Sequence, residues 1–413
     1  MAGPLNGIRV LDLSRVLAGP WSMQNFGDLG ADVLKIEKPG DGDDSRHWGP
    51  PWLKDADGKD TRQSAYYLSA NRNKRSVAID ISKPRGQELI RQLVAHCDVF
   101  IENYKVGGLA KYGLDYARIR EIRPDIIYLS LTGFGQTGPH AERPGYDYLF
   151  QGLGGLMSVT GERDGLPGAG PQRMGLPVID LFTGMYSTVA MLAALHHRNV
   201  TGQGQYIDVS LHDVALAVSS GAAMNYLLSG KPPTRTGNAS PNIAPYGVFP
   251  CADGQLIIAC GNQSQYVKLC GAIGRPELAT DPRFAANGGR LQNFPALFEE
   301  LSVALKKKTR AEWEDILYEV GVPAGPINDY KQALEHPQSI AHQNKIELDH
   351  PFGVKVPGIA SPFRFSETQI EYRLPPPLLG QHTREVLGQY LSIGDDEFGR
   401  MMADGVVGDV LRG

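Results

Sequence analysis

A single carboxylate, Asp180, stands at the head of a long apolar run, and this feature constrains the fold more than any other. The run extends from Leu181 to Leu195, and its apolar residues would cover nearly every face of a helix. A helix that is apolar all round is buried in the protein core. We therefore expect a rigid helix that carries Asp180 to the middle of the molecule.

Both ends of this expected helix are marked in the sequence. Residues 196–198 are His-His-Arg, cations suited to a helix C-terminus, and a Gly-Gln-Gly turn and a strand at 206–210 follow. At the other end, Asp180 has two compatible interpretations. Asp is among the best N-cap residues. A carboxylate that backbone N–H groups and the helix dipole keep ionised is also a competent nucleophile.

The residues around Asp180 resemble the active-site segment of the class III CoA-transferases, the CaiB/BaiF or formyl-CoA-transferase-like family. The matching pieces are Asp180, Thr183-Gly184-Met185 and the turn Arg198-x-x-Thr201-Gly-x-Gly-Gln205. The resemblance extends from Pro4 to about Val407, which is nearly the whole chain. It implies that Asp180 attacks an acyl-CoA as a covalent nucleophile. It also implies coenzyme A and acyl-CoA as substrates, with no permanently bound cofactor.

Composition limits the other function classes. The chain has 413 residues, of which 42% are hydrophobic and 21% charged, so it can bury a large core in two or three domains. Its net charge of −4 argues against a general nucleic-acid-binding protein. The four cysteines lack metal-ligand spacing, and we see no secretory leader and no uncharged membrane-spanning run. We therefore expect a cytoplasmic protein without a metal site, membrane contact or nucleic-acid partner.

Short apolar strands alternate with helical stretches in the first third of the chain. The expected strands are 7–14, 31–37, 76–80, 98–102 and 126–131. This alternation predicts βαβ units and an α/β fold with a doubly wound, mostly parallel sheet. Ligands of such sheets gather at the carboxyl ends of the strands. The loops at those ends follow Ser14, Glu37, Glu102 and Leu131.

The sequence changes character after residue 224. Residues 225–241 have the Gly- and Pro-rich composition of a linker. We predict a large doubly wound domain from residues 1–224, a small α+β domain at 242–328, and a return linker with the last part of the large domain at 329–413. The family resemblance further implies that the large domain binds CoA, that the monomer is a ring, and that two rings interlock as a homodimer.

Coenzyme A carries a compact polyanion that needs cations and backbone amides. Basic residues near the expected ligand edge qualify, although such runs are often only solvated surface. These cations are Lys38, Arg72, Lys74, Arg75, Lys105 and Lys111. The family resemblance adds Arg15, Leu17, Ala18, Asn71, Asn73, Asn103 and Tyr104. We expect Lys74 and Arg75 to hold the phosphates. At positions 38 and 111 family members vary between Arg and Lys, and Lys lacks the bidentate grip of Arg.

Tyr146 and Asp147 match the aromatic and acidic pair in the active sites of the family, although Asp147 could equally cap a helix. The related α-methylacyl-CoA racemases have His where Tyr146 stands. Racemisation needs a base and an acid across the α-carbon, and Tyr, with a pKa near ~10, replaces His poorly. Tyr146 therefore disfavours the alternative of an acyl-CoA racemase or isomerase. The intact segment around Asp180 disfavours a non-catalytic CoA-binding protein.

The stretch Gly133-Phe-Gly135-Gln-Thr-Gly138 has the spacing of a dinucleotide-binding fingerprint. That fingerprint requires a helix directly after the glycines, so that the helix N-terminus meets the pyrophosphate. Here Pro139 and a loop follow. A nicotinamide-dependent oxidoreductase is therefore the weakest hypothesis.

Further stretches resemble the succinyl-CoA–glutarate branch of the family more than the formyl-CoA branch. These are residues 46–51, 66–75 and 375–383. They imply succinyl-CoA as the CoA donor and a short dicarboxylate such as glutarate as the acceptor. The distal carboxylate of that acid must be desolvated beside Asp180, which demands a cation or neutral donors. Arg46 is our candidate, and a surface ion pair with Asp43 or Asp44 is the alternative.

Overall fold

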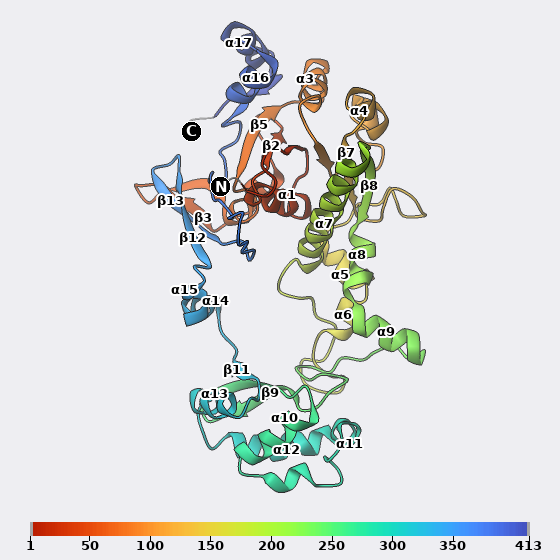
Figure 1. Ribbon diagram of the computed structural model, residues 1–413, viewed down its shortest axis with the longest axis vertical. Helices are drawn as coiled ribbons and strands as arrows, with labels where there is room; N and C mark the ends of the chain where they lie inside the picture. The colour runs from red at the N-terminus through yellow and green to blue at the C-terminus, as the bar shows by residue number, and fades with distance from the viewer. Residues whose placement is uncertain (1–2, 411–413) are drawn as a thin grey trace. The chain divides into compact units, whose positions relative to one another are not determined.

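The computed structural model describes residues 3–410, and its larger compact unit is built on a seven-stranded sheet. The strand order is β14-β5-β2-β1-β6-β7-β8. Figure 1 labels β5, β2, β7 and β8 of this sheet. The strands are β1 (Arg9–Asp12), β2 (Asp32–Glu37), β5 (Lys74–Ile79), β6 (Val99–Glu102), β7 (Ile127–Thr132), β8 (Gln205–Ser210) and β14 (Val407–Gly408). Every neighbouring pair is parallel except β14 with β5. The predicted mostly parallel sheet is therefore confirmed, and β14 adds the C-terminal part of the chain to it.

Helices cover both faces of this sheet, because successive strand residues point to opposite faces. Leu11 and Leu34 pack with one set of helices, and Val10 and Val33 pack with another. The first set is α3 (Pro84–Val94), α4 (Tyr116–Ile122), α16 (Thr383–Leu391) and α17 (Asp395–Ala403). The second set is α1 (Ala18–Asp28), α5 (Asp147–Leu153), α7 (Val178–Thr201) and α8 (Leu211–Val218). The sheet is therefore doubly wound.

Helix α7 carries Asp180 and differs from the prediction in two respects. The N-cap position is Pro177, so Asp180 lies inside the first turn and is not the N-cap. The helix is also not buried all round, since Phe182, Tyr186 and Val189 are 45%, 46% and 60% exposed. Their spacing of four and three residues places them on one side of the helix. The remaining sides pack against α1, α5, α8 and the sheet.

Glycines explain two parts of the motif around α7. A Cβ atom on Gly184 would lie 2.7 Å from the carbonyl oxygen of Ala18, so glycine permits the close approach of α7 to α1. At the other end, Gly202 terminates α7 in the left-handed conformation. A Cβ atom on Gly204 would lie 2.2 Å from the carbonyl oxygen of Ile126. Gly184 and Gly204 therefore permit close packing, whereas Gly202 permits the left-handed conformation that ends α7.

The second compact unit comprises residues 157–173 and 225–337. Its antiparallel sheet has the order β11-β10-β9 and packs with a set of helices around a core of its own. These elements are β9 (Tyr246–Cys251), β10 (Gly254–Ala259), β11 (Ala324–Pro326), α10 (Gln263–Ala272), α11 (Asn287–Gln292), α12 (Phe294–Leu305) and α13 (Arg310–Glu319). Residues 157–173, which we expected in the large domain, cluster with this unit. The other domain limits remain a prediction.

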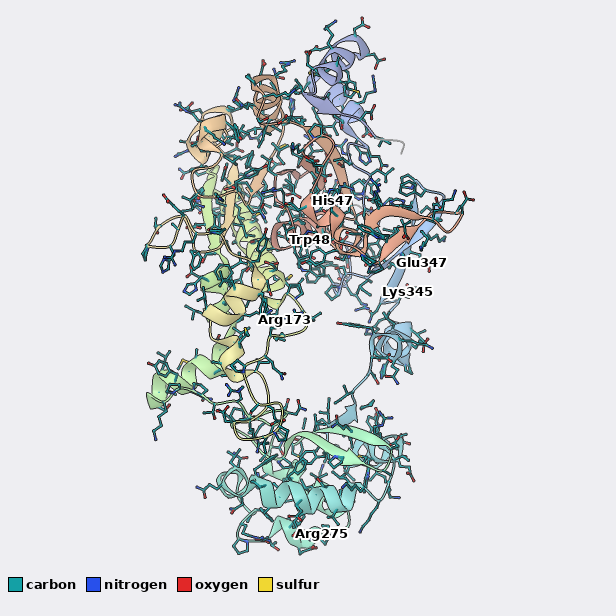
Figure 2. The ribbon with its side chains drawn as sticks, turned by 180° about the vertical axis from the view of Figure 1, so that it is seen from behind. His47, Trp48, Arg173, Arg275, Lys345 and Glu347 are labelled. Atoms are coloured by element: carbon teal, nitrogen blue, oxygen red, sulfur yellow. The ribbon has the colours of Figure 1, made fainter. Side chains whose placement is uncertain are left out.

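The remaining elements are short. They are η1 (Asp44–His47), β3 (Trp52–Lys54), β4 (Asp60–Ser64), α2 (Ala65–Leu68), η2 (Ala110–Tyr112), α6 (Leu156–Val159), α9 (Ser220–Ser229), η3 (Pro276–Ala279), α14 (Tyr330–Glu335), α15 (Pro337–Ala341), β12 (Lys345–His350) and β13 (Val354–Ile359). Strands β12 and β13 form a hairpin. Lys345 and Glu347, both on β12, form an ion pair at 3.3 Å (Figure 2).

Helix α7 is the one helix within residues 3–410 whose length and apolar composition would suffice to cross a membrane. Core helices of soluble proteins meet the same two criteria, and half of its most apolar window is buried. The predicted lack of membrane contact stays a prediction.

Candidate active site

Asp180 lines a cleft of about 210 Å³ at the carboxyl ends of β1, β6 and β7. The sheet order reverses between β1 and β6, and α/β folds bind ligands at such a point. The cleft brings together many residues that the sequence analysis selected. These are Arg15, Leu17, Ala18, Asn103, Tyr104, Lys105, Tyr146 and Asp180.

The Asp180 carboxylate is 8% exposed and accepts no hydrogen bond from residues 3–410. Burial, and after it the like charge of Asp147, raises the pKa of Asp180 to about 7. The prediction that helix amides keep this carboxylate ionised is therefore wrong. The N–H groups of Ile179 and Asp180 donate instead to Asp147 Oδ1, at 2.7 and 3.2 Å. Asp180 consequently populates both protonation states near neutral pH.

Asp147 caps the helix that bears Asp180, although it lies in the first turn of α5. Its Oδ2 atom accepts a hydrogen bond from Gln151 Nε2 at 2.6 Å. Fully buried Gln151 also donates to the carbonyl of Leu176 at 3.2 Å and accepts from the N–H of Met174 at 2.9 Å. Asp147 and Gln151 together fix the segment that enters α7. The alternative interpretation, in which Asp147 caps the helix that follows it, is wrong, because Tyr146 is the N-cap residue of α5 and Asp147 accepts the N–H groups of α7.

The exit loops of β1 and β6 are tied together where they line the cleft. Asn103 Oδ1 accepts the N–H of Arg15 at 3.0 Å, and Asn103 Nδ2 donates to the carbonyl of Arg15 at 2.8 Å. The Arg15 guanidinium lies 5.2 Å from the ring centroid of Tyr104 and pairs with Asp44 at 3.3 Å. Both partners of that pair are about half exposed, so the pair is weak and Arg15 can turn to an anionic ligand.

Two further cations line the cleft without an ion pair among the described residues, Lys105 and Arg143. We predicted Lys105 as a CoA contact but missed Arg143. A signal was present, because Arg143 belongs to the loop that leaves the carboxyl end of β7. The glycine spacing of residues 133–138, in the same loop, instead resembles a dinucleotide-binding fingerprint. That segment is a loop, and the next helix begins only at Asp147, so the dinucleotide fingerprint lacks its helix.

The predicted phosphate-binding residues at 71–75 lie away from the cleft. Lys74 is fully buried and donates to the carbonyl of Pro20 and to Asn71 Oδ1, each at 2.9 Å. Burial lowers the pKa of Lys74 to about 7. Arg75 is held by Asp32 at 2.6 Å. These residues stand at the amino end of β5, whereas the cleft is at the carboxyl ends, so the expectation that Lys74 and Arg75 hold phosphates is corrected.

The neighbours of Lys74 have structural partners as well. Arg72 donates to both carboxylate oxygens of Asp28, at 2.9 and 2.6 Å. Asn73 donates to Asp28 at 2.8 Å and to the carbonyl of Glu371 at 2.9 Å. Asn71 donates to the carbonyl of Tyr67 at 2.8 Å. Arg72 and Asn73 therefore join the start of β5 to α1 and to the C-terminal part of the chain, whereas Asn71 binds back to α2.

Arg46 is buried, and both interpretations of it are wrong. Its guanidinium donates to the two carboxylate oxygens of Glu37, at 2.8 and 2.9 Å. It also donates to Tyr67 Oη at 2.6 Å and to the carbonyl of Pro377 at 3.1 Å. The short turn η1 folds Arg46 back over the end of β2, so its donors do not face the cleft. A pair with Asp43 or Asp44 is not formed either.

Lys38 and Lys111 are surface residues outside the cleft lining. Lys38 pairs with Asp41 on the loop after β2, and both side chains are exposed. The Lys111 ammonium lies 4.7 Å from the ring centroid of Tyr112. Both lysines follow strand carboxyl ends on the same sheet edge as the cleft. Their role as CoA contacts remains a prediction.

The stretches 46–51 and 66–75, which are distant in sequence, meet in space. Trp48 is exposed, and its ring packs edge-on against Tyr66 with the centroids 5.0 Å apart. Burial raises the pKa of the Tyr66 hydroxyl, and the charges of Asp180 and Asp147 raise it further.

No cluster of three or more metal-ligating side chains occurs among residues 3–410. The four cysteines are buried and unpaired. We predicted neither a metal nor a disulfide, and both expectations stay predictions.

The family model for CoA-transferase family III matches residues 5–383. The chain belongs to this family. It is 46% identical over 390 residues to the succinate–glutarate CoA-transferase of Agrobacterium fabrum, with 94% of this chain and 96% of that protein covered. It is 41% identical over 406 residues to the succinyl-CoA:glutarate CoA-transferase of Mus musculus, with 98% and 90% covered. The predicted enzyme class, class III CoA-transferase, is thus confirmed.

Solved structures agree with this assignment. A CaiB/BaiF family protein from Brucella suis aligns with a TM-score of 0.83 at 46% identity, covering 94% of this chain and 100% of that one. The mixed α/β fold with a large, mainly parallel sheet is therefore shared with a CaiB/BaiF structure. CoA thioesters are the substrates of CoA-transferases, which agrees with the predicted use of CoA as substrate.

Proposed function

We propose that this class III CoA-transferase moves CoA from succinyl-CoA to a short dicarboxylate such as glutarate, with Asp180 as the covalent nucleophile. One observation carries the proposal. Asp180 is a buried carboxylate that accepts no hydrogen bond from the described residues, 3–410, and it lines a cleft at the sheet's ligand edge. The names of the relatives from Agrobacterium fabrum and Mus musculus support the choice of substrates.

The proposed reaction exchanges one thioester for another through the side chain of Asp180. Ionised Asp180 attacks the acyl thioester and forms a mixed anhydride as CoA thiolate leaves. The thiolate then attacks the Asp180 carbonyl, which releases the free acid and leaves an aspartyl-CoA thioester. The acceptor carboxylate attacks this thioester to form a second anhydride, and the returning thiolate takes the acceptor acyl group. No general base is needed, because every nucleophile is an anion.

The proposed reaction requires that water be excluded and that Asp180 be ionised, and the environment of Asp180 suits both requirements. Burial excludes water, which would hydrolyse each intermediate. The raised pKa, about 7, makes Asp180 more basic than an ordinary carboxylate while leaving an ionised fraction at neutral pH. Arg15, Lys105 and Arg143 supply positive charge in the same cleft for the CoA phosphates and the incoming carboxylate.

Tyr146 supports the transferase over a racemase. Its side chain is exposed in the cleft beside Asp180. A racemase needs a base and an acid across the α-carbon, and a tyrosine here does not replace the histidine of that branch.

We further propose that the enzyme is a cytoplasmic homodimer of interlocked rings without nucleic-acid or membrane partners. The apolar side chains of Phe182, Tyr186 and Val189 support a protein partner, because they form an exposed side on an otherwise buried helix. The family resemblance supplies the interlocked arrangement.

The substrate proposal is tested with matched acids. Purified enzyme receives succinyl-CoA with glutarate or with butyrate, and the new CoA thioester is quantified by mass. We expect kcat/KM for glutarate to exceed that for butyrate by ~10²-fold or more, because a missing charge leaves its buried partner unpaired. Comparable values would contradict the dicarboxylate preference and leave the transferase activity intact. The absence of any exchange across a panel of donors and acceptors would refute the proposed function.

A further inference from the structure

We propose that Asp43, which lies outside the cleft, is a positioning residue that locks Val16 in a strained backbone conformation and so shapes the cleft wall opposite Asp180. The inference rests on the proposed function, because it concerns how the same cleft holds acyl-CoA. Three observations support it: the strained backbone of Val16, the buried ion pair of Lys35 with Asp43, and the hydrogen bonds between Asp43 and Val16.

Val16 is strained at a place where the strain has a geometric effect. Its φ is +74°, the left-handed region, which a β-branched side chain rarely adopts. Val16 lies between Arg15 and Leu17, and all three line the cleft with Asp180. Because helix α1 begins at Ala18, the backbone turn at Val16 sets where the helix starts relative to the cleft. Strain of this kind persists only where the surroundings fix the conformation.

Asp43 is the group that holds this conformation. Its two carboxylate oxygens both accept the N–H of Val16, at 3.1 and 3.2 Å. Asp43 is 1% exposed and is not part of the cleft lining. Its oxygens also accept the N–H and hydroxyl of Ser45, at 2.9 and 2.8 Å. The hydrogen bonds from Ser45 thus fix the Asp43 carboxylate independently of its contact with Val16.

Lys35 completes the lock from β2. Its fully buried ammonium donates to Asp43 Oδ2 at 2.9 Å and to the carbonyl of Ser14 at 3.1 Å. Lys35 therefore holds the residue that begins the exit loop as well as the carboxylate that binds Val16. Burial opposes the charge on Asp43, but the ammonium of Lys35 and the Ser45 hydrogen bonds keep the pKa of Asp43 at about 2, so the pair is ionised.

A role in the cleft explains this arrangement better than a role in stability. Buried ion pairs are often no more stabilising than apolar residues of the same size. Here the pair also stabilises a local conformation that is itself unfavourable. The ion pair therefore acts by fixing the geometry of the cleft wall, and the position of this wall relative to Asp180 governs the reaction.

The experiment is a double-mutant cycle between positions 43 and 16 in the full-length enzyme. Glycine adopts φ near +74° without steric strain, so a loop with Val16→Gly depends less on Asp43. We expect Asp43→Asn to reduce kcat/KM for succinyl-CoA by ~30-fold in the wild-type background and by less than about threefold in the Val16→Gly background. Calorimetry should give the same pattern for the Kd of CoA alone.

The buried pair of Asp28 and Arg72 provides a matched control, because it has similar burial and lies outside the cleft lining. Any loss caused by Asp28→Asn should be the same in both backgrounds. If Asp43→Asn does not fold, Lys35→Gln enters the cycle in its place. Equal losses at position 43 in the two backgrounds would overturn the proposal. CoA binding is measured without an acceptor, so failure of glutarate as a substrate would leave this test decisive.

Discussion

At the scale of single residues, the environment of Asp180 gives a pH dependence that can be measured. Burial and the charge of Asp147 raise the pKa of Asp180 from 3.8 to about 7. The nucleophile is the ionised form, so the first-turnover rate should be low below this pKa and rise as pH increases through about 7. An ordinary exposed carboxylate would instead be fully ionised over the whole range from pH 6 to 8.

Asp147→Asn tests the cause of this shift. The variant removes the like charge but keeps an oxygen that accepts the N–H groups of Ile179 and Asp180, so α7 stays capped. We expect the acidic limb of the first-turnover rate to move to lower pH, yet to stay well above 3.8 because burial is the larger cause. Rapid-quench measurements from pH 5 to 9 would show this. Asp44→Asn is the control, and a limb that moves equally in both variants would contradict this assignment.

Sequence reasoning at this scale succeeded where a residue lies on a strand exit and failed where a side chain found an internal partner. Lys105 follows β6 and lines the cleft, because the parallel topology brings the strand exits to one edge of the sheet. Arg46 was misplaced because its partner, Glu37, was hidden in the turn of η1. The direction of the Asp180 pKa shift was missed because Asp147 takes the helix amides from a different segment. Such long-range partners leave no local pattern in the sequence.

At the scale of secondary-structure elements, the contact between α7 and α1 positions the nucleophile. Gly184 allows the two helices to approach at the carbonyl of Ala18, one turn from Asp180. The added Cβ atom of Gly184→Ala would meet that backbone oxygen at 2.7 Å, and backbone cannot rotate away. We expect a loss of about 1–3 kcal/mol in the free energy of unfolding, together with a lower kcat.

Gly221→Ala is the matched control for this prediction. It also adds one methyl group within a helix, but nothing lies within 4 Å of its Cβ position. The control should be neutral or slightly stabilising, since Ala favours helix more than Gly by about 1 kcal/mol. Chemical denaturation and steady-state kinetics on the two variants give the comparison. A Gly184→Ala enzyme with wild-type stability and kcat would show that the helix contact does not position Asp180.

The order of helices and strands could be predicted from the sequence, but the residue at which α7 begins and the side of α7 that is exposed could not. The periodicity of hydrophobic residues and the local composition predicted the parallel strands and the long helix, because strands and helices alike follow from local sequence pattern. The helix start at Val178 was missed because Asp180 is a good cap residue by type, while the cap is supplied by Asp147 from α5. The exposed side of α7 was also missed, since its Phe, Tyr and Val residues are as apolar as the buried ones.

At the scale of the whole molecule, the exposed apolar side of α7 predicts self-association. Val189 lies between Tyr186 and the end of the helix and is 60% exposed among the described residues. Replacing Val189 by Glu would bury a charge in the proposed dimer contact, which is strongly unfavourable. We expect wild type to have the mass of a dimer in light scattering and Val189→Glu to shift toward monomer at micromolar concentration.

The control for this prediction changes charge on an exposed surface away from α7. Val303→Glu in α12 has a similar exposed starting residue, 58% against 60%, and should leave the mass unchanged. A wild-type enzyme that is monomeric at all concentrations would contradict the homodimer. The interlocked arrangement itself came from family resemblance, since no local pattern in one chain encodes how two copies are threaded.

The central claim is that Asp180 is covalently involved in every turnover, and isotope transfer tests it most directly. The acceptor is supplied as glutarate labelled with ¹⁸O in its carboxylates, together with succinyl-CoA. In the proposed reaction the acceptor oxygen becomes the bridge of the second anhydride and stays with Asp180 when CoA thiolate takes the acyl group. Mass analysis of the peptide containing Asp180 should therefore show one ¹⁸O atom after a single turnover and up to two after repeated turnover. Asp180→Ala should lose exchange by at least ~10³-fold. Continued exchange with no label in Asp180, or with label in another residue, would contradict the account.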